Sequence, residues 1–161
     1  MRLDAMYQEI ILDHYRNPHN KGLRDPHNAE AHHINPTCGD EITLRVTLEP
    51  AAGGAGLDGS ALVRDVSYDS MGCSISQASA SVLTDLLIGR SVDDGMRTLE
   101  AFTFLMQSKG QGEPDEDVLE DAVAFAGVSK YPARIKCALL AWMAWKDATA
   151  QSLQKEKEGA S

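Results

Sequence analysis

Residues 41–49 alternate between apolar and polar side chains, and this pattern limits the possible folds more than any other segment. The apolar face carries Ile42, Leu44, Val46 and Leu48. Such alternation predicts a strand with one face in a core and the other toward water. Residues 51–60 contain four glycines, which suits a hairpin loop, and alternation resumes over 61–69. In that second strand we expect one face to carry Leu62, Arg64, Val66 and Tyr68.

The rest of the chain favours helices over strands. An amphipathic pattern covers residues 3–16 and ends at Asn17-Pro18, before a turn-rich stretch with a possible extended piece at 29–34. Further helices are expected at 74–89, from 91 to about 105, at about 117–126, and from 132 to about 150. Ser74 and Gln77 have the spacing of a capping box.

These elements predict an α+β fold, in which a small antiparallel sheet packs against a cluster of helices. A chain of 161 residues has room for one domain with a core. We expect that domain to span residues 1–150, and we expect residues 151–161 to form a frayed, charged tail.

Composition excludes several classes of function. The net charge of -9 argues against binding to nucleic acid or to an anionic membrane surface. The start of the chain leads into no apolar segment, and the longest apolar run is too short to cross a bilayer. We therefore expect a cytoplasmic protein with reduced thiols.

The chain has three cysteines, which is too few and too irregular for a disulfide framework. Cys38 lies in a loop before the first clear strand, close to Asp40. Cys73 directly precedes a helix, whose N-terminus stabilises a thiolate. Cys137 lies near the start of the last helix, beside Arg134 and Lys136. Alternatively, each cysteine has no chemical role and is only a small apolar side chain buried in the core.

The five histidines are also metal-ligand candidates in principle. They are His14, His19, His27, His32 and His33. All lie in the polar N-terminal third of the chain, so we predict that they are surface residues without a metal.

Four motifs, in order, resemble the IscU/SufU family of iron–sulfur cluster assembly proteins, which includes the NifU N-terminal domain. The motifs are Asp13-His14-Tyr15-Arg16-Asn17-Pro18, Asn35-Pro36-Thr37-Cys38-Gly39-Asp40, Gly72-Cys73-Ser74-Ile75-Ser76-Gln77-Ala78-Ser79 and Arg134-Ile135-Lys136-Cys137. The resemblance runs from about residue 5 to 148. It implies the α+β fold of that family.

Three departures from the scaffold-type IscU pattern resemble the SufU branch of the family. Lys136 stands where the scaffold-type IscU pattern has a histidine, and the Leu-Pro-Pro-Val-Lys chaperone stretch is absent. Extra sequence also occurs at about 107–127. SufU-like proteins bind one zinc ion and take sulfane sulfur from SufS, a PLP-dependent cysteine desulfurase. The resemblance implies that the zinc ligands are Cys38, Asp40, Cys73 and Cys137.

The resemblance and the chemistry of the residues also suggest roles for these side chains. We expect Cys38 to be the sulfur acceptor, because it lies in a loop while the other cysteines are tied to helices. Asp40 would be the labile ligand, since zinc holds thiolates more firmly than one carboxylate. Arg134 and Lys136 would provide electrostatic support to the negative site. Alternatively, Arg134 and Lys136 are simply part of a helix face that is exposed to solvent.

Three functions therefore compete. The first is a zinc-dependent sulfurtransferase that passes persulfide sulfur to downstream cluster-assembly proteins. The second is a scaffold that assembles a transient [2Fe-2S] cluster on the same cysteines. The third is an adaptor with a structural zinc ion. Lys136 and the missing chaperone stretch favour the first.

Overall fold

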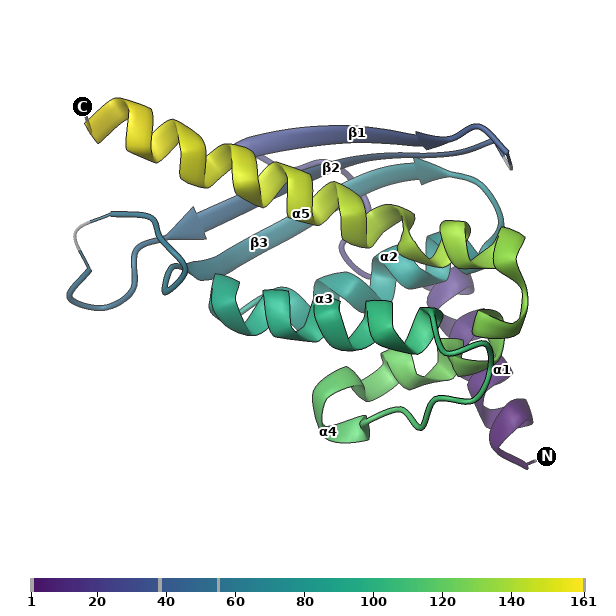
Figure 1. Ribbon diagram of the computed structural model, residues 1–161. Coiled ribbons are helices and arrows are strands. Elements are labelled where there is room, and N and C mark those ends of the chain that lie inside the picture. Colours follow the sequence, from purple (N-terminus) through teal and green to yellow (C-terminus); the bar gives the residue numbers. More distant parts are fainter. Residues whose placement is uncertain (1, 38, 55, 161) are drawn as a thin grey trace.

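A three-stranded antiparallel sheet forms one layer of the molecule, and the helices gather on one side of it (Figure 1). The computed structural model describes residues 2–37, 39–54 and 56–160. The elements are, in chain order, α1 (Arg2–Arg16), β1 (Ala29–Asn35), β2 (Asp40–Glu49), β3 (Leu62–Met71), α2 (Ser74–Leu87), α3 (Val92–Met106), α4 (Glu116–Leu119), the 3-10 helix η1 (Glu120–Lys130) and α5 (Pro132–Ala160). The α+β prediction is confirmed.

The central strand β2 pairs with β1 on one side and with β3 on the other. Its burial alternates along the whole strand, with the apolar positions inside, as the sequence predicted. The expected hairpin of β2 and β3 is present, and the possible extended piece at 29–34 is β1. Helix α5 packs across β1 and β2, while α2 packs against β3.

The sequence wrongly predicted which side chains of β3 point into the core at the N-terminal end of the strand. The β2–β3 register shifts between Thr47 and Leu48. This irregularity changes the phase of the alternation, so Val63 is buried and Arg64 is exposed. Val66 and Tyr68, beyond the shift, are buried as expected. A single-residue shift of this kind reverses which side chains face the core.

Helices α2, α3 and α5 share the main hydrophobic core. The rings of Phe102 and Trp142 stack with centroids 4.3 Å apart and planes 10° from parallel. The indole N–H of Trp142 donates to the Ser79 hydroxyl at 2.9 Å, and that hydroxyl donates to the Ala138 carbonyl at 2.6 Å. This buried chain of hydrogen bonds joins α2 to α5.

Two predicted helix boundaries differ from the structure. The helix expected at about 117–126 is the short α4 followed by η1, which continues past Gly127 to Lys130. Helix α5 continues to Ala160, beyond the expected end near 150. The reason is local: residues 150–155 contain no proline or glycine, and Ser152, which is buried, donates a hydrogen bond to the Ala148 carbonyl one turn earlier. The single-domain extent and the fraying of the tail stay predictions.

No helix in the described ranges is both long enough and apolar enough to span a membrane.

We predict that Phe102→Ala lowers the free energy of unfolding by about 3–5 kcal/mol, because it removes a fully buried ring stacked on Trp142. Phe104, on the same helix, is 74% exposed and provides the matched control. We expect Phe104→Ala to change stability by less than about 0.5 kcal/mol. Urea denaturation followed by circular dichroism measures both. Equal losses for the two variants would contradict this assignment of the core.

Candidate metal centre

The pairing of β2 with β3 brings Asp40 and Cys73 together across 33 positions of sequence. Asp40 is the first residue of β2, and its neighbour Glu41 pairs with Met71, the last residue of β3. Gly72 then connects β3 to Cys73, which is the N-cap residue of α2. The start of one strand and the end of its partner therefore form one edge of the centre.

The Asp40 carboxylate is oriented by the backbone of Cys73. Asp40 is 1% exposed, and its Oδ1 accepts a hydrogen bond from the Cys73 N–H at 3.0 Å. Its Oδ2 lies 3.9 Å from the Cys73 Sγ. A buried carboxylate needs such a partner, because desolvation of the charge is costly. The second oxygen faces the thiol.

Cys137 enters the centre from the second turn of α5 and is 1% exposed. Its Sγ lies 3.9 Å from the Asn35 amide nitrogen and 3.7 Å from the Ala133 carbonyl. Asn35 ends β1 and pairs with Asp40 in the sheet. The hydrogen bond from Ser79 to Ala138, one residue after Cys137, fixes α2 against α5 at this point.

The structure brings together three of the four predicted ligands. Asp40, Cys73 and Cys137 each offer one donor atom, and these atoms all lie within 4.8 Å of one another. Two sulfurs and one carboxylate oxygen belong to a donor set that zinc accepts. Cys38 lies outside the described residues. The buried, backbone-bonded carboxylate beside two thiols therefore fits a metal ion.

Gly72 is required by the close packing at this turn. Its φ is +151°, which other residues rarely adopt. A Cβ added here would lie 2.3 Å from Asp40 Oδ1 and 2.8 Å from the Ser76 hydroxyl. Any side chain at Gly72 would thus displace the Asp40 carboxylate.

Arg134 and Lys136 are exposed on the first turns of α5. Neither forms an ion pair with the residues that the structure describes. Arg134 borders a hollow of about 620 Å³ between α1, η1 and α5, and Lys136 borders another of about 360 Å³ beside β1. Their electrostatic role stays a prediction.

Sequence reasoning missed two residues that touch the thiols. They are Asn35, beside Cys137, and Ser76, whose hydroxyl lies 3.9 Å from the Cys73 Sγ. Both belong to the motifs quoted above, so their position beside a cysteine was the available signal. The capping box is not formed: Cys73 is the N-cap residue, and the Gln77 amide donates to the Gly72 carbonyl instead.

The expectation that all histidines are surface residues is wrong for His14, which is 3% exposed. Its position on the inner face of α1 explains the difference, since α1 packs against α2 and η1. His27, His32 and His33 pair with the carboxylates of Asp25, Glu41 and Asp147 respectively.

Comparison with known proteins identifies the family. The model of the NifU-like N terminal domain matches residues 6–138. The chain belongs to the IscU/SufU family. It is 42% identical over 92% of its length to the zinc-dependent sulfurtransferase SufU of Bacillus subtilis, covering 92% of that protein. It is 36% identical over 94% of its length to the iron–sulfur cluster assembly scaffold protein IscU of Streptococcus pyogenes, covering 87% of that protein.

The fold of the family is also shown by a solved structure. The crystal structure of the N-terminal part of a nitrogen-fixing NifU-like protein from Brucella abortus superposes with a TM-score of 0.78 at 25% identity. The match covers 96% of this chain and 99% of that one. The IscU-like fold expected from the motifs is confirmed, and the chain is a member of a family of cluster-assembly scaffolds and sulfur-transfer proteins.

We predict that Gly72→Ala weakens zinc binding by roughly tenfold or more, because the new methyl group displaces Asp40 Oδ1 and strains the backbone. Gly127→Ala is the control, since a Cβ there meets no atom within 4 Å. Competition with a chromogenic chelator measures the affinity. Unchanged affinity in a folded Gly72→Ala protein would contradict the placement of Asp40 at the centre.

Proposed function

We propose that this protein is a zinc-dependent sulfurtransferase that accepts persulfide sulfur from a cysteine desulfurase and passes it on for iron–sulfur cluster assembly. The observation that carries the proposal is the cluster of Asp40, Cys73 and Cys137, which converges at one edge of the sheet. The similarity to a protein named as a zinc-dependent sulfurtransferase supports the choice within the family.

Asp40, Cys73 and Cys137 would hold the zinc ion together with Cys38. When bound, zinc keeps its cysteine ligands in the thiolate form near neutral pH. Three thiolates and one carboxylate carry four negative charges, of which a divalent ion neutralises two. We expect Arg134 and Lys136, exposed on the first turns of α5, to offset part of the remainder.

The sulfur-transfer step itself needs only a thiolate and a persulfide. The acceptor thiolate attacks the outer sulfur of the desulfurase's cysteine persulfide and forms a new S–S bond. The old S–S bond breaks, and the desulfurase cysteine leaves as a thiolate. The proton of the persulfide stays with the transferred sulfur, so the step is balanced without an added oxidant or reductant.

Cys38 is the proposed acceptor. Cys137 is 1% exposed and is enclosed by α5 and β1, so a bulky persulfide cannot reach it directly. Cys73 is partly exposed but forms the N-cap of α2. The neighbours of Cys38 in the chain, Thr37 and Gly39, are both exposed. Attack on a partner's persulfide requires this kind of access.

Asp40 is the ligand that we expect to be exchanged most readily. Its Oδ1 accepts from the Cys73 N–H, while Oδ2 is the oxygen that faces the thiol. If Oδ2 is withdrawn from a metal ion, the carboxylate still keeps its backbone hydrogen bond. Asp40 can therefore lose one bond without becoming an unsatisfied buried charge.

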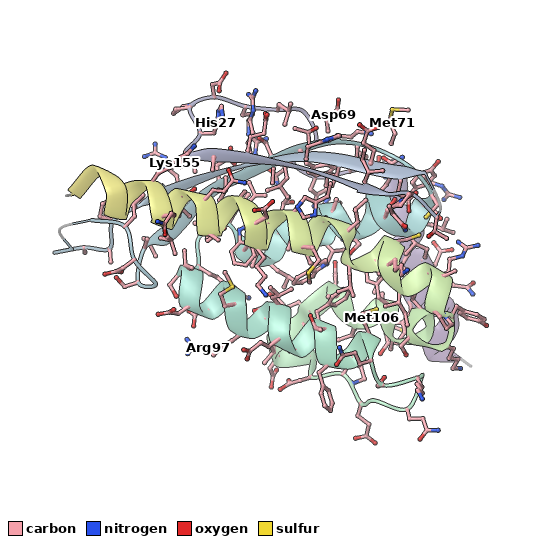
Figure 2. All side chains as sticks on the ribbon, turned by 45° about the horizontal axis from the view of Figure 1, so that its top comes forward. His27, Asp69, Met71, Arg97, Met106 and Lys155 are labelled. Atoms are coloured by element: carbon pink, nitrogen blue, oxygen red, sulfur yellow. The ribbon has the colours of Figure 1, made fainter. Side chains whose placement is uncertain are left out.

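Three exposed apolar side chains lie close in sequence to residues of the centre and suit a protein partner. Met71, at the end of β3, is 70% exposed and is labelled in Figure 2. Ile34 is 56% exposed beside Asn35, and Tyr131 is 61% exposed before α5. Exposed large apolar residues around a polar site are typical of interaction surfaces. The proposed desulfurase would dock here.

The alternative is a scaffold that assembles a transient [2Fe-2S] cluster on the same cysteines. The similarity to the Streptococcus pyogenes scaffold protein IscU favours it. A third alternative, a structural zinc adaptor, would use the same ligands without any sulfur transfer. The three differ in what accumulates on the cysteines.

We predict that incubation with a SufS-type desulfurase, PLP and cysteine adds the mass of one sulfur atom to Cys38. Cys38→Ala should abolish this adduct, because the acceptor thiolate is gone. Thr37→Ala, a change at the exposed neighbouring position, is the control and should accept sulfur like the wild type. Peptide mass spectrometry after alkylation locates the adduct, and metal analysis gives the zinc content.

Two outcomes would favour the alternatives. A stable brown cluster, formed anaerobically in place of a colourless zinc protein, would support the scaffold. A zinc protein that never acquires sulfur on any cysteine would support the adaptor. If the adduct persisted in Cys38→Ala, the acceptor would have to be another cysteine.

We predict that Asp40→Asn weakens zinc binding by at least about tenfold, because it replaces a charged ligand with a neutral amide while keeping the side-chain shape. Asp69→Asn removes an exposed carboxylate two residues from the end of β3 and is the matched control (Figure 2). Chelator competition at constant ionic strength compares the two variants. Equal affinities would exclude Asp40 from the ligand set.

A further inference from the structure

A second group of metal-ligating side chains lies where α1 and the segment after it pack against α2. It consists of His14, His19 and Asp85, each of which offers one donor atom within 4.8 Å of the others. The imidazole rings of His14 and His19 have centroids 4.8 Å apart. His14 is buried, while His19 and Asp85 are 45% and 43% exposed. The cluster is therefore anchored inside the protein and open on one side.

This cluster is separate from the thiol centre. Cys73 begins α2, and Asp85 lies 12 residues further along the same helix. At 1.5 Å per residue, that separation is about 18 Å along the helix axis. One ion cannot contact both groups.

The Ser81 hydroxyl holds both histidines in place. It accepts a hydrogen bond from the His19 backbone N–H at 2.9 Å and lies 2.8 Å from His14 Nδ1. The Nε2 of His14 lies 3.1 Å from Asp121 Oδ2, so an Nε2–H donated to that carboxylate leaves the Nδ1 lone pair for a metal ion, once the Ser81 hydroxyl rotates away from it. A second carboxylate thus stands beside the buried imidazole, in the position that orients metal-ligating histidines.

Hydrogen bonds hold the segment that carries His19 against both α2 and β3. The Asn20 amide donates to the Thr84 hydroxyl at 2.9 Å. The backbone at Lys21 pairs with Tyr68 on the outer edge of β3, and the Gly22 N–H donates to the Tyr68 carbonyl at 2.6 Å. The histidine is therefore presented by a fixed backbone, which lowers the entropic cost of binding an ion.

The charges at the cluster are not neutralised by Lys or Arg. Within the described part of the chain, Asp85 forms its ion pair with His19, and Asp121 forms its ion pair with His14. Neither carboxylate has a lysine or arginine within salt-bridge distance in that part of the chain. Two carboxylates next to two imidazoles form a site that a divalent cation would neutralise.

A buried hydroxyl provides an independent observation at the same place. Tyr68 is fully buried, and its hydroxyl has no hydrogen-bond partner of good geometry among the described residues. Burial raises its pKa to about 12, with the Ser81 hydroxyl acting to lower the pKa and the Asp85 charge acting to raise it. The hydroxyl is thus a buried donor to which the described residues offer no acceptor of good geometry. Such a donor is ready for an anionic or water ligand at the cluster.

We propose that His14, His19 and Asp85 form a second metal site, for a first-row divalent cation such as Zn²⁺, Fe²⁺ or Co²⁺. Two imidazoles and one carboxylate are the donor set of open zinc sites and of non-haem ferrous sites. It contains no thiolate, so its metal preference differs from that of the Asp40 centre.

Only small movements are needed for this coordination. Two donors on one tetrahedral zinc ion lie about 3.3 Å apart. His19 Nδ1 and Asp85 Oδ2 are 2.5 Å apart, and the widest separation in the cluster is under 4.8 Å. His19 and Asp85 are the exposed members, so their side chains can adjust while the buried His14 stays in place.

The test titrates Co²⁺ into the full-length protein after one molar equivalent of zinc has been added. Calorimetry and visible absorption together should show about one further equivalent bound, without the charge-transfer band that thiolate ligands give. His19→Ala and Asp85→Asn should each weaken this binding at least tenfold. His27→Ala is the matched control, because it removes another histidine from a carboxylate pair, on the loop before β1 (Figure 2). It should bind cobalt like the wild type.

The proposal is overturned if the wild type binds no further cobalt, or if folded His19→Ala and Asp85→Asn proteins bind it like the wild type. The comparison between wild type and His19→Ala does not depend on how the thiol centre behaves. Loss of sulfur transfer would therefore leave this result standing, and failure of the cobalt site would leave the sulfurtransferase proposal standing.

Discussion

The antiparallel pairing of β2 with β3 is the constraint on which the candidate centre depends. It places the start of β2 beside the end of β3, so that Asp40 and Cys73 meet although they are 33 positions apart. Gly72 makes the turn between sheet and helix without a side chain, and the Cys73 N–H then orients the carboxylate. Backbone hydrogen bonds thus position Asp40 and Cys73, two of the candidate ligands, without a metal ion.

Helix α2 connects this centre to the rest of the molecule. At its N-terminus it supplies Cys73, and in its middle Ser79 fixes α5 and hence Cys137. Two and six residues after Ser79, Ser81 and Asp85 meet His14 and His19 respectively. The same buried helix therefore positions a thiol-rich centre at its start and an imidazole-rich cluster near its end. The two differ in donor chemistry, which allows them to be tested separately.

Much of the fold could be predicted from local patterns. The alternation in residues 41–49 identified the central strand, and the glycine-rich segment after it identified the hairpin. The β2–β3 irregularity at Thr47 was not visible, because a bulge depends on how two strands meet and not on either one alone. The burial of His14 was also missed, since the partner that covers it, α2, lies more than sixty residues away.

The sequence by itself determined the family and the α+β order of elements, and it singled out the three cysteines and Asp40 as candidate ligands, because motifs and periodicity are local properties of the chain. Only the tertiary structure decided which of these side chains meet. It placed Asn35 and Ser76 beside the thiols and showed that the Asp40 carboxylate is bonded to the backbone of Cys73. It also brought His14 and His19, from α1 and the segment after it, next to Asp85 on α2. The physical reason is that contacts between distant residues are set by strand register and helix packing, which no local pattern encodes.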